Sequence, residues 1–82
     1  MNQQLVFNND FQFDAVRQAV RFSCLVAGLK VNCFVALPAS ATASEFLASV
    51  KAEAFSWEDS AERAIADDAY NEAGEILLYL TD

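Results

Sequence analysis

The stretch 20–37, VRFSCLVAGLKVNCFVAL, constrains the fold more than any other part of the chain. From Val20 to Val26 every even position is apolar, whereas from Leu29 to Leu37 every odd position is apolar. Side chains alternate between the faces of a strand, so both apolar sets share one face if antiparallel strands meet at a two-residue turn, Ala27–Gly28. A four-residue turn gives the same pairing, and Gly28 supplies the positive φ that tight turns need. The sequence therefore predicts a β-hairpin with one apolar face.

The other face of this hairpin carries a mixture of polar and apolar side chains. In the predicted register Arg21 lies across from Phe34, and Leu25 lies across from Lys30. Scattered apolar side chains are common on protein surfaces, so this face is either ordinary surface or a contact with another subunit. The candidate interface residues are Arg21, Leu25, Phe34 and Ala36.

Two cysteines, Cys24 and Cys33, fall on the apolar face of the hairpin as diagonal neighbours. Diagonal positions in a sheet lie roughly 7–8 Å apart, which is farther than a disulfide comfortably spans. The first residues lack the basic segment and long apolar run of a secretory signal. We therefore expect reduced, buried thiols in a cytoplasmic protein.

Two short apolar runs precede the hairpin. Residues 5–7 are long enough for an edge strand, and residues 11–13 alternate Phe with Gln as a second extended piece does. Residues 8–10, Asn-Asn-Asp, favour a turn between the two runs. The strand status of residues 5–13 stays open at this point.

Residues 44–73 show helical spacing of their apolar side chains. Thr42 or Ser44 is the expected N-terminal cap. The segment forms either one long bent helix or two helices, the second of which would be capped at Ser56. Gly74 is expected to end it.

Residues 76–80 are apolar throughout and predict a last strand that is covered on both faces. The order of elements predicts a single α+β domain over residues 1–82. Its antiparallel sheet has three to four strands, in β-β-β-α-α-β order, with two helices packed on one face. A candidate ligand pocket between the sheet and the helices would be lined by Phe22, Cys24, Phe46 and Trp57, unless these residues are simply core.

Charge is distributed unevenly along the chain, whose formal net charge is −7. Residues 1–41 carry two acids and three bases, whereas residues 42–82 carry ten acids and two bases. An acidic surface repels phosphates, so nucleic-acid binding is disfavoured and would depend on a small patch of Arg17, Arg21 and Lys30. The chain has no uncharged stretch of eighteen apolar residues, so we expect no membrane-spanning helix.

The residue types present exclude most catalytic chemistry. Histidine is absent, which removes the commonest general base and the usual partner of nucleophilic Ser or Cys. Two glycines cannot build a phosphate-binding loop. The acids Glu58, Asp59 and Glu62 are best interpreted as a solvated helix surface, because Ca²⁺ needs six or more gathered oxygens. We expect neither an enzyme nor a metal or cofactor site.

The order of features resembles a family of short bacterial proteins, domain of unknown function family 1488. The resemblance depends on Phe13-Asp14, Val20-Arg21-Phe22, Gly28, Ala66, Tyr70, Ile76-Leu77-Leu78 and Thr81-Asp82. It implies an α+β fold and a cytoplasmic bacterial setting. It implies no activity, and no catalytic residue is carried over from it.

Three functions are compatible with these patterns. The favoured one is a small acidic protein-interaction or regulatory module that acts as a homodimer. The first alternative is a small-molecule-binding domain, and a nucleic-acid-associated regulator is the second.

Overall fold

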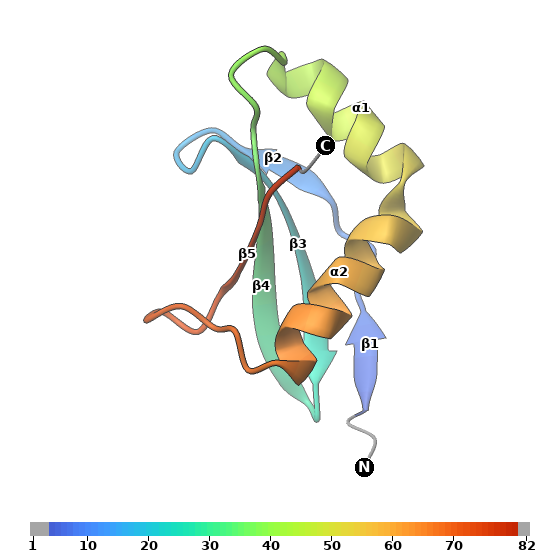
Figure 1. The fold of residues 1–82 in the computed structure, drawn as a ribbon. Coiled ribbons are helices and arrows are strands. Elements are labelled where there is room, and N and C mark those ends of the chain that lie inside the picture. Colours follow the sequence, from blue (N-terminus) through green and yellow to red (C-terminus); the bar gives the residue numbers. More distant parts are fainter. Residues whose placement is uncertain (1–3, 81–82) are drawn as a thin grey trace.

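The computed structural model describes residues 4–80 and has an α+β architecture, with both helices lying along one side of a sheet (Figure 1). This confirms the predicted fold class. The sheet has five strands, one more than the predicted maximum, because residues 5–7 and 12–14 form separate strands. In chain order the elements are β1 (Leu5–Phe7), β2 (Gln12–Asp14), β3 (Ala19–Val26), β4 (Leu29–Ala36), α1 (Ala43–Ala52), α2 (Ala54–Ala66) and β5 (Ile76–Leu78).

The central hairpin of β3 and β4 has the predicted register. Val26 pairs with Leu29, and the pairing continues to Ala19 opposite Ala36. The turn residues Ala27 and Gly28 have φ values of 51° and 87°, the positive pair that a type I′ turn requires. The turn twists in the same sense as the strands that it joins, so the two apolar sets share one face.

The first two strands both pair with β3, one after the other along the same edge. Between β1 and β2 the chain is not paired with β3 as a strand. The carboxylate of Asp10 accepts the hydrogen bonds of Ser23 in place of a strand partner. The backbone N–H of Ser23 donates to Asp10 Oδ1 at 2.8 Å, and the Ser23 hydroxyl donates to Asp10 Oδ2 at 2.6 Å. Asn9, with φ 59°, allows the chain to bend there.

The last strand, β5, pairs with β4 in parallel, so the prediction of a purely antiparallel sheet is wrong at this edge. Cys33 lies beside Ile76, and Val35 beside Leu78. The two helices return the chain to the end of the sheet at which β4 began, so the next strand runs in the same direction as β4.

The region between β4 and β5 contains two helices that meet at Glu53, which settles the open choice between one helix and two. Thr42 caps α1, accepting the backbone N–H of Glu45 on its hydroxyl at 3.4 Å. The predicted cap at Ser56 is wrong, because α2 begins at Ala54 and Glu53 offers no side-chain cap.

The second helix ends earlier than predicted, at Ala66 and not at Gly74. Asp68 adopts a left-handed φ of 58°. The N–H of Ala69 then bonds the Ala64 carbonyl at 2.9 Å, and the N–H of Asp68 bonds the Ile65 carbonyl at 3.0 Å. This is the Schellman pattern of helix termination, with Asp in the position that glycine usually takes.

The core lies between the helices and the face of the sheet that the parity pattern predicted to be apolar. Phe22 is at its centre, with the ring of Phe11 stacked at 4.7 Å and that of Phe7 at 6.2 Å. Within residues 4–80, neither helix has the length and apolar character needed to cross a bilayer. The buried apolar cluster consists of Phe11, Val20, Phe22, Cys24, Val26, Val31, Cys33, Val35, Phe46, Val50, Trp57, Ala61, Ile65, Ile76 and Leu78.

Candidate functional site

The face of the sheet opposite the helices is here called the open sheet face. The β3–β4 register puts Arg21 opposite Phe34, and Leu25 opposite Lys30, on this face. All four candidate interface residues therefore lie where the sequence predicted, since Ala36 follows Phe34 at the same parity. By strand parity the open sheet face carries Val6, Gln12, Asp14, Ala19, Arg21, Ser23, Leu25, Lys30, Asn32, Phe34, Ala36 and Leu77.

The most prominent aromatic residue of the open sheet face is covered by this chain itself. Phe34 is only 5% exposed, because the guanidinium of Arg17 lies 4.0 Å from the centre of its ring. This is a cation–π contact, which Arg makes well through its planar, weakly hydrated head group. Arg17 comes from the turn between β2 and β3, so a loop side chain covers the middle of β4.

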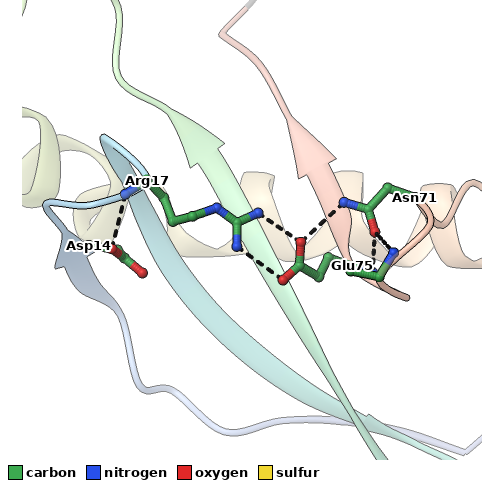
Figure 2. Close-up of polar contacts among 5 residues, drawn as sticks. Asp14, Arg17, Asn71 and Glu75 are labelled. Carbon is green, nitrogen blue, oxygen red and sulfur yellow. Dashed lines mark hydrogen bonds and ion pairs between the residues drawn. The ribbon is translucent and has the colours of Figure 1, made fainter.

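Arg17 is held over Phe34 by a two-pronged ion pair with Glu75, in the segment just before β5 (Figure 2). Its two terminal nitrogens lie 2.7 and 3.1 Å from the Glu75 oxygens. Asn71 donates to Glu75 Oε1 at 3.1 Å and accepts the backbone N–H of Glu75 at 2.9 Å. The hydrogen bonds from Arg17 and Asn71 lower the pKa of Glu75 to about 2. The pair thus ties the β2–β3 turn to the loop before β5.

Beside this ion pair the open sheet face is hollowed by a pocket of about 230 Å³. Ala19 and Ala36 lie opposite each other in the register, and their small side chains leave a depression between larger neighbours. Leu77 and Tyr79, at its β5 side, are 42% and 62% exposed. The pocket is lined by Arg17, Ala19, Phe34, Ala36, Leu77, Leu78 and Tyr79.

The residues predicted to line a ligand pocket under the helices do come together, but as parts of the packed core. All four, Phe22, Cys24, Phe46 and Trp57, belong to the buried apolar cluster. The pocket described above lies on the opposite face of the sheet and shares none of them.

A polar cluster occupies the centre of the open sheet face. Asn8 donates to the Ser23 hydroxyl at 2.9 Å, and Asp10 receives both Ser23 donors. Partial burial alone would raise the pKa of Asp10, but the Ser23 hydrogen bonds outweigh it and lower that pKa. Asn32, the register partner of Ser23, has a buried side-chain oxygen with no hydrogen-bond partner among the described residues.

The two thiols are free and buried on the covered face, as expected. A hydrogen bond with the Cys24 thiol, together with burial, raises the pKa of the Cys33 thiol. A protonated, buried thiol is a poor nucleophile and a poor metal ligand. Among residues 4–80, no three His, Cys, Asp or Glu side chains gather closely enough to hold a metal ion.

The pocket and the ion pair were not predicted from the sequence. Arg17 and Glu75 are 58 positions apart, and no local pattern connects them. The available signal for an apolar hollow at this end of the sheet was the apolar run at 76–78, together with the paired Ala19 and Ala36.

Comparison with known proteins gives the chain a family. The sequence profile of a protein family of unknown function, DUF1488, matches residues 5–78. The crystal structure of a DUF1488-family protein from Shewanella loihica PV-4 superposes with a TM-score of 0.84, covering 100% of this chain and 99% of that one, at 21% sequence identity. No curated protein matches the chain. The protein therefore belongs to the DUF1488 family, as its sequence pattern indicated.

Proposed function

We propose that this protein is a non-enzymatic, cytoplasmic interaction module that works as a homodimer, through the β5 side of its open sheet face. One observation carries the proposal. The side chains of β5 are apolar on both faces, yet only Ile76 and Leu78 are buried within the chain, while Leu77 and Tyr79 stay exposed beside an apolar pocket. Exposed apolar side chains around a pocket are typical of protein–protein contact sites.

Charge favours this side of the molecule over the helices as the contact with a second copy. The side chains on the open sheet face, with the Arg17–Glu75 pair, balance three acids (Asp10, Asp14 and Glu75) against three bases (Arg17, Arg21 and Lys30), leaving out Asp67, Asp68 and Glu72 of the loop before β5. The helical segment 43–66 carries five acids and two bases. Two identical acidic surfaces repel each other, so a dimer that keeps its helices outward avoids that cost.

Size is also in favour of association. A stable interface buries roughly 800 Å² on each partner, about one seventh of the 5404 Å² that this chain exposes. Burial of that area would add to the modest stability that a single core of this size provides.

A small-molecule site in the same pocket is the second candidate. The observation in its favour is the combination of the Arg17 guanidinium and the exposed Tyr79 in one apolar hollow. At about 230 Å³ the hollow is below the usual range of drug-sized ligand sites, roughly 300–1,000 Å³. Nucleic-acid binding is less favoured still, because Arg17 is already neutralised by Glu75.

Molar mass in solution tests the dimer. Light scattering after size exclusion, from low to high micromolar concentration, should give twice the chain mass for the wild type. Leu77→Ser and Tyr79→Ser should shift the protein to monomer. Phe55→Ser is the matched control, because Phe55 is 88% exposed on α2, in the helix layer, and should leave the dimer intact. A wild-type monomer at every concentration would contradict the proposal.

A further inference from the structure

The two edges of the sheet are protected to very different degrees. The edge formed by β1 and β2 is interrupted by residues 8–11, and each strand is only three residues long. Asp10 and Asp14 place charge along it. Interrupted strands and charges are the means by which natural sheets prevent edge-to-edge pairing.

The β5 edge is also only three residues long, but it is continuous and carries no charge. Residues 76–80 read Ile-Leu-Leu-Tyr-Leu, with no charge and no proline. In the described part of the chain β5 pairs only with β4, so its other side presents unpaired backbone N–H and C=O groups. Leu77 on β5, and Tyr79 and Leu80 in the two residues after it, are all exposed. An uncharged, apolar edge of this kind pairs readily with another strand.

From this contrast we propose that β5 pairs antiparallel with β5 of a second copy across a two-fold axis, which joins the two sheets into one. The proposal rests on the homodimer proposed above and specifies how its two copies meet. Each chain contributes its five strands, and the shared sheet is continuous through the axis. The helices of both copies then lie on the same side of that sheet.

A second copy of this chain suits the β5 edge, because no charged side chain on one edge would repel the same side chain on the other. An isologous contact brings each residue of one strand against residues of the same segment in the other, and residues 76–80 contain no charge. The nearest charge before the strand, Glu75, is already paired with Arg17. Because the β1–β2 edge is protected, the assembly closes at two copies and does not extend into a fibre.

The pairing also accounts for the exposed side chains. Residues on one face of a strand stay on that face when an antiparallel partner is added. Leu77 and Tyr79 of both copies would therefore lie side by side on the joined open face, with the two pockets flanking the axis. The unpaired backbone groups of β5 would gain partners in the same step.

Backbone amide exchange of the wild-type protein tests the pairing directly. Successive N–H groups of a strand point alternately to its two sides, so only every second amide of residues 76–80 faces away from β4. We expect these outward-facing amides to exchange at least about tenfold more slowly in the dimer than in dilute monomer, because paired edge amides open only when the dimer does. A dimer in which the outward-facing amides exchange as fast as in the monomer would overturn the edge pairing, while leaving the homodimer itself in place. A wild-type monomer at all concentrations would overturn both proposals.

Two substitutions separate edge pairing from packing of the open faces against each other. Leu77→Lys puts onto β5 the charge that protected edges carry and should give a monomer. Leu25→Gln changes the open sheet face on β3, two strands away from the edge, and should leave the dimer intact. Near-ultraviolet circular dichroism confirms that both variants fold. A monomeric Leu25→Gln or a dimeric Leu77→Lys would overturn the edge pairing.

Discussion

The two faces of the sheet are built from the same strands but stabilised in different ways. On the covered face, Val20, Phe22 and Cys24 pack against helices, and among residues 4–80 no charged residue is buried. On the open sheet face, buried groups depend on one or two partners from loops: Phe34 on Arg17, and Ser23 on Asp10 and Asn8. The covered face therefore depends on hydrophobic burial, which many residues share, whereas the open face depends on a few specific contacts.

Truncation of one aromatic residue on each face should give the largest contrast. Phe22→Ala leaves a cavity in a closed core and should lower the free energy of unfolding by about 3–5 kcal/mol. Phe34→Ala should cost less, because the pocket beside it lets Arg17 and solvent fill the space. Urea denaturation of both variants measures the difference. Phe55→Ala, on the exposed side of α2, should have almost no effect; equal losses at positions 22 and 34 would contradict the contrast.

Removal of the Asp10 carboxylate, which takes the place of a strand partner for Ser23, should give the next largest loss of stability. Asp10→Ala leaves the buried N–H and hydroxyl of Ser23 without an acceptor, at an expected cost of about 1–3 kcal/mol. Because the pKa of Asp10 is lowered in the folded state, its contribution is complete above the ordinary pKa of 3.8 and is lost as pH falls through the folded pKa. The wild type and variant should thus converge in stability in acid. Asp10→Asn, which keeps one acceptor, should lose less than Asp10→Ala.

The contrast between the faces also explains which parts of the fold the sequence could predict. Parity along residues 20–37 predicted the register and the buried face, since period-two burial is a local pattern. It could not predict the direction of β5, because strand direction depends on how the intervening helices return the chain. The early end of α2 was missed because the left-handed residue there is Asp68, and the sequence offered Gly74 as the more usual terminator.

The open sheet face was predictable only in part. Its four candidate residues were placed correctly because they follow from the same parity. The cover of Phe34 was not predictable, since Arg17 reaches it from a turn and is fixed by Glu75, far along the chain. Contacts between loops have no periodicity, so a single sequence gives no signal for them.

The turn at Ala27 fixes the register and so keeps the two faces distinct. Its substitution by Asn should change the free energy of unfolding by a smaller amount, and should raise it. Ala27 has a φ of 51°, a left-handed conformation that costs a residue with a β-carbon roughly 1–2 kcal/mol. Ala27→Asn creates the Asn-Gly pair preferred in type I′ turns, and should raise stability by about 0.5–1 kcal/mol. Thermal denaturation at one protein concentration measures it. Ala27→Val, which is β-branched and tolerates positive φ poorly, should be destabilising, and a stable Ala27→Val would contradict the strain.

Loss of the Arg17–Glu75 ion pair should change stability least at neutral pH, because partly exposed pairs contribute little. The contribution of this pair can still be identified, because it depends on pH. The folded state lowers the pKa of Glu75 from 4.5 to about 2. The contribution is therefore complete above pH 4.5 and is lost as pH falls toward 2. The denaturant midpoints of wild type and Glu75→Gln should differ at pH 7 and converge near pH 2. Asp59→Asn, which removes a carboxylate from the exposed pair on α2, controls for the loss of one surface charge. If the Glu75→Gln difference stayed constant over this range, the carboxylate would not be holding Arg17 in place over Phe34.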